Sequence, residues 1–208
     1  NLQHRENDFV DFDVERLIPK MLSTETPRLA TGDVNGDGLE DFLMTSAMAD
    51  TAKLFLQQPN GTFSEKAQAA FIAHKYFENT GAVFFDADGD KDLDLAMASG
   101  GNQAKQGSPY LTPRLYANDG KGNFIRNKVS LPSVSVNASC IRAADFNGDG
   151  AIDLFIGARS IPGSYGVSPY SVLLQNNGTG NFADVTHSAA PELFNLRMVT
   201  EGEWVDTD

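Results

Sequence analysis

The chain has few of the residues on which several common classes of site depend. It contains one cysteine, one tryptophan and three histidines among 208 residues. A single cysteine excludes a disulfide within the chain, and no cysteine–histidine spacing typical of a zinc site occurs. No run of about 18 apolar residues is present, which excludes a membrane-spanning helix by sequence. The polar opening Asn1–Glu6 does not resemble a signal peptide.

Basic residues are also scarce. Sixteen lysines and arginines face 28 aspartates and glutamates, giving a formal net charge of −12. Because nucleic-acid affinity depends on basic side chains that neutralise phosphates, this balance argues against a nucleic-acid partner. The histidines lie far apart, at His4, His74 and His187, and neither a nucleophile elbow nor a phosphate-binding glycine loop occurs. The familiar catalytic motifs are therefore missing.

What the chain does have is an acidic nine-residue loop that occurs three times, at residues 33–41, 86–94 and 145–153. Positions 1, 3, 5 and 9 of each copy are aspartate or asparagine, with glycines between them. Oxygen ligands in this density suit Ca²⁺, and clustered carboxylates repel one another unless a cation lies among them. The loops lack the glutamate that an EF-hand requires at position 12, and apolar runs follow them in place of helices.

We predict about three structural Ca²⁺ ions, one in each loop. The side chains at positions 1, 3, 5 and 9 and the backbone carbonyl at position 7 are the expected ligands. They are Asp33, Asn35, Asp37, Leu39 and Asp41; Asp86, Asp88, Asp90, Asp92 and Asp94; and Asp145, Asn147, Asp149, Ala151 and Asp153. The side chains of Glu40 and Asp92 should then point outward. The alternative is that these are acidic turns that bind nothing, since the same residues favour turns.

The loops divide the chain into repeats. Their first aspartates, and a fourth copy that begins at Trp204–Asp208, recur every 50–60 residues or so, a period typical of propeller blades. An apolar run follows each loop, and a second run ends in a glycine-rich turn closed by Phe63, Phe124 or Phe182. Such turns between apolar runs are hairpin signals, so each unit is predicted to contain four short antiparallel strands. Unbroken apolar runs favour strands that are buried on both faces.

The predicted fold class is therefore all-β: a partial β-propeller of about three four-stranded blades and the start of a fourth. Residues 28–208 form the propeller repeats, with units that start near residues 29, 82, 141 and 202. Residues 1–27 fit no repeat and form an N-terminal segment, either a cap or an edge strand at Phe9–Phe12.

The third loop and its strand, residues 145–158, resemble the FG-GAP repeat of integrin α-chain propellers. The longer unit, with its Asn-Gly-x-Gly-x-Phe hairpin, resembles bacterial VCBS/FG-GAP repeat proteins, which are secreted or lie at the cell surface. The resemblance covers residues 28–208 and implies a calcium-stapled propeller in an extracellular or cell-surface setting. Two departures from the family are the small number of complete units and Lys91, which replaces the usual glycine.

Two long loops, at residues 100–114 and 159–170, occupy the same position in successive units, and both contain Ser-Pro-Tyr. Long loops on a rigid scaffold are where binding residues concentrate, and these two should emerge on one face. Aromatic and arginine side chains stack on sugars or anchor protein partners. The candidate ligand-binding residues are Tyr110, Arg114, Arg159, Tyr165 and Tyr170. The alternative is that the tyrosines pack between blades.

These patterns predict a non-catalytic, calcium-binding extracellular scaffold that recognises or adheres to a protein or glycan. The alternative is a fragment of a carbohydrate-active enzyme built on a calcium-stapled propeller, because a catalytic carboxylate pair can assemble between blades without a sequence signature. A partial propeller exposes a blade face, and self-association through that face is a further expectation.

Overall fold

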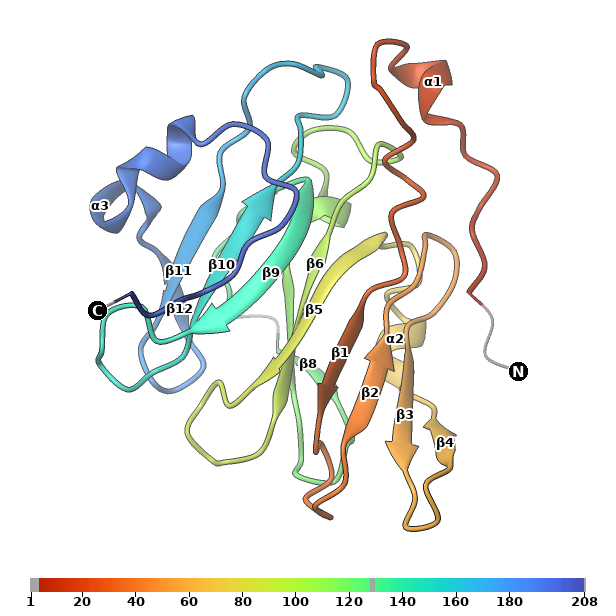
Figure 1. Cartoon of the computed structure of the whole chain (residues 1–208), viewed down its shortest axis with the longest axis vertical. Helices are drawn as coiled ribbons and strands as arrows, with labels where there is room; N and C mark the ends of the chain where they lie inside the picture. The colour runs from red at the N-terminus through yellow and green to blue at the C-terminus, as the bar shows by residue number, and fades with distance from the viewer. Residues whose placement is uncertain (1–3, 128–129, 208) are drawn as a thin grey trace.

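The computed structural model describes residues 4–127 and 130–207. Three four-stranded antiparallel sheets, one for each predicted unit, make up most of it (Figure 1). The first blade contains β1 (Leu29–Gly32), β2 (Asp41–Met44), β3 (Lys53–Gln57) and β4 (Phe63–Lys66). The second contains β5 (Asn79–Phe85), β6 (Asp94–Ser99), β7 (Arg114–Ala117) and β8 (Ile125–Asn127). The third contains β9 (Ala138–Ala144), β10 (Asp153–Ala158), β11 (Val172–Asn176) and β12 (Phe182–Asp184). The prediction of an all-β chain of propeller-type blades is confirmed.

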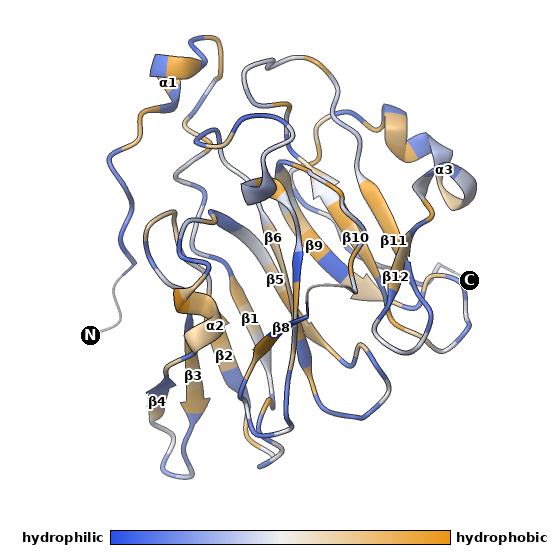
Figure 2. Cartoon of the chain, turned by 180° about the vertical axis from the view of Figure 1, so that it is seen from behind, coloured by the Kyte–Doolittle hydropathy of each residue, from blue (hydrophilic) through white to orange (hydrophobic). Residues whose placement is uncertain are grey.

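Helices in the described residues are short and lie in the connections. They are α1 (Asp11–Val14), α2 (Ala69–Ile72) and α3 (Thr186–Ala189), with the 3₁₀ turns η1 (Pro109–Leu111) and η2 (Pro191–Asn195). Figure 2 shows that hydrophobic residues concentrate on the strands, whereas the loops at both ends of the sheets are largely hydrophilic. The sheets therefore supply the core, and the loops supply the two polar ends.

The blades stack face to face through their alternating side chains. Leu95 and Met97 of β6 belong to the core shared with the first blade, whereas Ala96 and Ala98 belong to the core shared with the third. The middle sheet is thus covered on both faces, which is why its apolar runs are continuous rather than alternating. The first strands β1, β5 and β9 lie next to one another, so one edge of every blade faces a common axis.

The two outer sheet faces have no blade against them in the described part of the chain. On the first blade, Phe42 stacks on Phe55 with ring centroids 4.8 Å apart and meets Phe63 edge to face at 4.9 Å. On the third blade, Phe155 and Leu173 line a groove of about 650 Å³. Both faces are apolar, and self-association through them stays a prediction.

Residues 199–205 run along the third blade where the first strand of another unit would lie. The N–H of Val199 donates to the Ala158 carbonyl at 2.8 Å, as the N–H of Asn79 donates to the Ser46 carbonyl at 3.0 Å. These bonds occupy corresponding positions in the repeat. Residues 199–207 form no strand, and a fourth unit that starts near residue 202 stays a prediction.

The N-terminal segment forms no strand within its described residues, so the edge-strand hypothesis for Phe9–Phe12 is wrong. Residues Asp11–Val14 form α1, and the segment lies across the end of the blades opposite the acidic loops (Figure 1). The Asp11 carboxylate is buried and accepts the backbone N–H of Ser23 at 3.3 Å. Ile18 and Leu22 are the large apolar side chains that the segment buries.

Glu78, at the same end of the molecule, is a buried carboxyl group. Its Oε2 accepts the N–H of Met48 at 2.7 Å, and its Oε1 accepts the hydroxyl of Thr26 at 3.2 Å. Burial, followed by the nearby Glu6 carboxylate, raises the pKa of Glu78 to about 7, and the Met48 and Thr26 bonds only partly offset the increase. Folding therefore favours the protonated form of Glu78.

This pKa predicts a loss of stability as pH rises. An acid whose pKa is higher in the folded state contributes stability below its unfolded value of 4.5, and that contribution is lost as pH rises through about 7. The expected loss is on the order of 3 kcal/mol. Urea unfolding at pH 5 and pH 8 measures it. In the Glu78→Gln variant the free energy of unfolding should depend less on pH. An equally steep dependence on pH in the variant would reject Glu78 as the cause.

Candidate metal loops and the opposite loop face

The three acidic loops occupy equivalent places in the fold. Each connects the first and second strands of its blade, so all three emerge at the same end of the sheets (Figure 1). The glycine-rich turns that join the third and fourth strands lie at that end as well. Antiparallel pairing forces this arrangement, because successive strands run in opposite directions. The connections that follow the first and third strands of a blade therefore lie at the same end of the sheet.

The first aspartate of each loop organises the backbone around it. Asp33 Oδ1 accepts the N–H of Gly36 at 2.8 Å, and its Oδ2 accepts the N–H of Gly38 at 2.7 Å. The third loop repeats both bonds, and each distance agrees within 0.1 Å. Asp145 accepts from Gly148 at 2.7 Å and from Gly150 at 2.8 Å. Such bonds wrap the chain around the carboxylate of position 1.

The aspartate at the ninth position also links the loop to the rest of its blade. Asp94 is buried; its Oδ2 accepts the N–H of Ala87 at 3.1 Å, and its Oδ1 accepts the N–H of Asn118 at 2.9 Å. One carboxylate thus ties the second residue of the loop to the start of the next hairpin. The same pair of bonds is made in the other blades by Asp41 and Asp153. Each oxygen retains a lone pair with which it can bind a metal ion.

The second loop brings three carboxylates together. Asp86, Asp88 and Asp94 each place an oxygen within 4.8 Å of those of the other two. Burial raises the pKa of Asp94 to about 6, and the neighbouring carboxylates of Asp88 and Asp92 add to the effect. A cation at this point would remove the repulsion, so the residues present fit a hard divalent ion. Loops one and three have Asn35 and Asn147 at the third position, where the amide oxygen is a neutral ligand.

Two residues of the second loop depart from the pattern. Lys91 has φ 76°, the left-handed conformation that Gly38 (83°) and Gly150 (87°) adopt in the other loops. A side chain in this conformation costs about 1 kcal/mol. Asp92 is half-buried, and its Oδ1 is enclosed without a hydrogen-bond partner. The expectation that the Asp92 side chain points outward is wrong, because the turn around Gly120 packs against it; Glu40 is exposed as expected.

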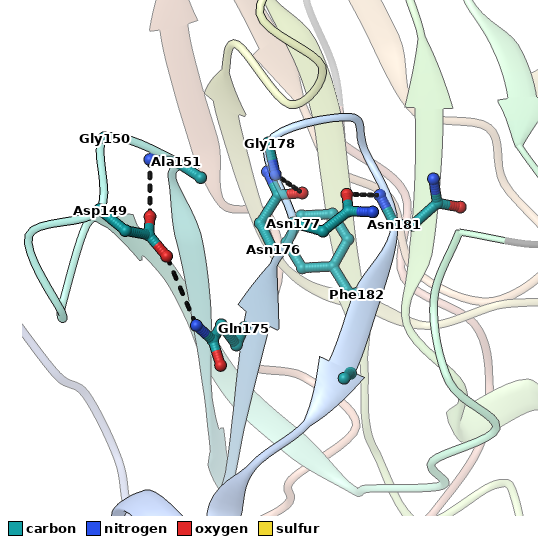
Figure 3. A pocket seen from close by; sticks show the side chains of 10 residues that line it. Asp149, Gly150, Ala151, Gln175, Asn176, Asn177, Gly178, Asn181 and Phe182 are labelled. Atoms are coloured by element: carbon teal, nitrogen blue, oxygen red, sulfur yellow. Dashed lines mark hydrogen bonds between the residues drawn. The ribbon is translucent and has the colours of Figure 1, made fainter.

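A groove of about 760 Å³ lies between the third acidic loop and the β11–β12 turn. Figure 3 shows Asp149 at its edge, where the carboxylate accepts the N–H of Ala151 at 2.9 Å and the Nε2 of Gln175 at 3.4 Å. Asn177 and Asn181 line the opposite wall. These bonds brace the loop against the sheet and leave the fifth-position carboxylate at the surface.

The predicted ligand loops lie at the other end of the blades. Both connect the second and third strands, and both approach the same carboxylate, that of Glu15. Tyr110 and Tyr170 are each 43% exposed. Tyr110 packs edge to face on Phe77 at 5.4 Å, and Tyr170 stacks on Phe194 at 5.7 Å. The two tyrosines therefore combine packing with an open ring face.

Arg114 does not belong to this surface. It is fully buried in β7, where its guanidinium donates to Asn79 and, at 2.8 Å, to the Ser99 hydroxyl, and lies 4.0 Å from the centre of the Phe77 ring. Burial lowers the pKa of Arg114 to about 10. The hypothesis that Arg114 contacts a surface ligand is wrong, because its place in the strand turns it into the core between blades.

Arg159 and Tyr165 are engaged by the N-terminal segment. Arg159 donates to the Glu25 carboxylate at 2.9 Å, and the backbone N–H of Tyr165 donates to Glu15. Asn102, from the other long loop, donates its Nδ2 to Glu15 at 3.2 Å. Sequence reasoning missed Glu15, Glu25 and Asn102, since no local spacing links residues that are more than 85 positions apart.

Within residues 4–127 and 130–207, no helix is both long and apolar enough to span a membrane. No curated protein matches the chain.

A family model described as FG-GAP-like repeat matches residues 33–97 and again residues 86–156. Each match begins at the first aspartate of an acidic loop and ends in the second strand of the following blade. The matched residues make up more than half of the chain. The chain belongs to the FG-GAP-like repeat family.

Proposed function

We propose that the chain is a calcium-stapled recognition scaffold, in which each acidic loop holds one structural Ca²⁺ ion and the opposite loop face binds a partner. The proposal is supported by the acidic sequence pattern that recurs in three blades and by the second loop, where Asp86, Asp88 and Asp94 place oxygens within 4.8 Å of one another. Side-chain oxygens from positions 1, 3, 5 and 9 and the carbonyl at position 7 would hold each ion. The ion would join the first two strands to the hairpin that position 9 already contacts.

The donor set favours Ca²⁺ over other ions. Ca²⁺ takes six to eight oxygen ligands in flexible geometry, whereas Mg²⁺ requires a near-ideal octahedron and retains water. No histidine or cysteine lies in the three loops, which argues against zinc. Exposed modular loops of this kind bind weakly, in the range that the millimolar calcium outside cells saturates. This affinity range supports an extracellular or cell-surface location.

The recognition surface centres on Tyr110 and Tyr170. The rings contact Phe77 and Phe194, and each tyrosine is 43% exposed. Exposed aromatic side chains of this kind can stack on a sugar or anchor a protein side chain. We propose a glycan or protein ligand and a binding rather than a catalytic role. Hydrolysis of a glycoside needs two carboxyl groups across a cleft. Asp149 is the one carboxylate among the residues that line the 760 Å³ groove, and the two that line the 650 Å³ groove, Glu201 and Glu203, are paired with Arg142.

Binding to arrays of glycans and extracellular proteins in millimolar calcium tests the surface. The double variant Tyr110→Ala, Tyr170→Ala should lose roughly tenfold or more in affinity for any ligand found, with little change in unfolding temperature. Tyr76→Ala is the matched control, because Tyr76 is 52% exposed and lies outside both loops. Equal loss in the control, or unfolding of the double variant, would reject the aromatic surface. Release of reducing ends from an arrayed polysaccharide would reject the non-catalytic role.

A further inference from the structure

The N-terminal segment shows an inverted pattern of burial. Asp11 and Glu15 are 0% and 7% exposed, whereas Phe12, Val14 and Leu17 are 41%, 59% and 89% exposed. A surface segment normally buries its apolar side chains and exposes its carboxylates. Here Asp11 bonds to Ser23 within the segment, and Glu15 bonds to loops of the second and third blades. Residues 8–17 are therefore held to the protein mainly by polar contacts.

The Glu15 carboxylate binds three neutral donors, Asn102 Nδ2 and the N–H groups of Gly163 and Tyr165, which together are called the cradle. Its Oε2 accepts the Nδ2 of Asn102 at 3.2 Å and the N–H of Gly163 at 3.4 Å, and its Oε1 accepts the N–H of Tyr165. Gly163 and Gly166 have φ of 79° and 93°, the left-handed conformation, and they flank the turn whose Gly163 and Tyr165 N–H groups reach Glu15. Backbone concavities of this type bind anions. The donors come from both long loops, so the cradle spans two blades.

A second carboxylate docks on the same loop. Glu25 Oε1 lies 2.9 Å from Arg159 and 2.7 Å from the Nζ of Lys20. Loop 159–170 thus receives two carboxylates from one segment, through a guanidinium at its start and backbone N–H groups at its centre. Loop 159–170 therefore accepts negative charge at two places.

We infer that Asn102, Gly163 and Tyr165 form a carboxylate-recognition site, that Glu15 occupies it in cis, and that its ligand in trans is an acidic peptide segment. The inference rests on the proposed recognition function, of which it names one ligand class. The N-terminal segment then acts as a built-in competitor, which covers the site until a partner displaces it.

The polar character of the contact makes displacement feasible. Burial removes water from a carboxylate, and this desolvation cost offsets much of what its hydrogen bonds contribute. A buried, hydrogen-bonded carboxylate therefore adds less net stability than the burial of an apolar side chain. Ile18 and Leu22, which are buried, would keep the segment anchored while residues 8–17 leave. The exposed side chains of Val14 and Leu17 would lose no packing on release, because they have little in the docked state.

Because Glu15, a residue of a peptide chain, occupies the site in the structure, we favour a peptide over an acidic sugar as the ligand. Glu15 belongs to a polypeptide, and its side chain reaches donors from both long loops. The site therefore accepts a carboxylate that is presented on a peptide main chain. A uronate polymer offers the same chemical group on a sugar ring, and it serves as the competing ligand in the test.

The test uses the full chain in millimolar calcium and a fluorescent peptide of residues 8–17. Binding is measured by anisotropy to wild type, to Glu15→Ala and to Asp13→Ala, the matched control that removes an exposed carboxylate from the same segment. A tethered occupant acts at roughly millimolar effective concentration, so emptying the cradle should tighten peptide binding about tenfold or more. Asp13→Ala should behave as wild type, and a peptide carrying Glu15→Gln should lose the gain.

Equal binding to wild type and Glu15→Ala, or no binding to Glu15→Ala, would overturn the inference. Binding of an oligogalacturonate in place of the peptide would overturn the peptide assignment. If Glu15→Ala does not fold, Asn102→Ala removes one donor and should weaken retention of the segment, seen as faster hydrogen exchange at residues 8–17; unchanged exchange would overturn the inference. A chain that binds an arrayed ligand through Tyr110 and Tyr170 but no peptide would reject this inference and leave the proposed function standing.

Discussion

Transfer of the protein from millimolar calcium to excess chelator should lower its thermal unfolding midpoint by roughly 20 °C. Binding to the native state alone stabilises by about 2.7 kcal/mol for each site at a hundredfold excess of ion over Kd. Three such sites give about 8 kcal/mol, and each kcal/mol corresponds to roughly 2–4 °C in a chain of this size. The crowded Asp86, Asp88 and Asp94 carboxylates add to the loss, because they repel one another when no cation lies among them.

The control for this melt is magnesium at the same ionic strength. Magnesium should restore little of the lost stability, because these loops do not impose an octahedron. An unchanged midpoint in chelator would mean that the loops are acidic turns, stable through their own hydrogen bonds. The extracellular location would then lose its main support as well.

Replacement of Asp94 by alanine should destabilise the protein by about 3 kcal/mol even in chelator. The change leaves the N–H groups of Ala87 and Asn118 without an acceptor in a buried place, and each costs about 1–3 kcal/mol. Asp90→Asn should behave differently. It keeps the size of the side chain and the oxygen that accepts the N–H of Asp92, and it removes a charge from the proposed metal cage.

Urea unfolding with and without calcium separates the two roles. Asp94→Ala should be destabilised in both conditions, whereas Asp90→Asn should match wild type in chelator and lose stability only when calcium is present. Asp88→Asn is the matched control, because Asn35 and Asn147 occupy that position in the other loops. Equal stability of Asp94→Ala and wild type in chelator would show that position 9 does not join the loop to the hairpin.

The repeat made much of this fold predictable. Gly122–Phe124 and its counterparts mark hairpins by local turn chemistry, and the unbroken run Leu95–Ala98 indicates a strand buried on both faces. The structure places these residues as those rules require. The order of strands also followed, because short connections force neighbouring strands to pair.

The remaining features depend on contacts between distant residues. The sequence does not distinguish the fully buried Arg114 from the partly exposed Arg159, because each lies at one end of a similar loop. The difference is the environment of Asn79, Ser99 and Phe77 around Arg114. Likewise, the apolar residues of Phe9–Phe12 fit a short strand. In the structure Asp11–Val14 form a helical turn, in which the N–H of Glu15 donates to the Asp11 carbonyl, and the Asp11 side chain bonds to the distant Ser23.

The number of Ca²⁺ ions bound by the metal-free protein tests the central claim most directly. Calorimetric titration should give three ions per chain, and Asp90→Asn should reduce the number of tight sites to two while loops one and three remain filled. A titration that gives no binding, or binding that persists unchanged when Asp90 and its counterparts Asp37 and Asp149 are all replaced by asparagine, would contradict the assignment of the acidic loops as calcium sites.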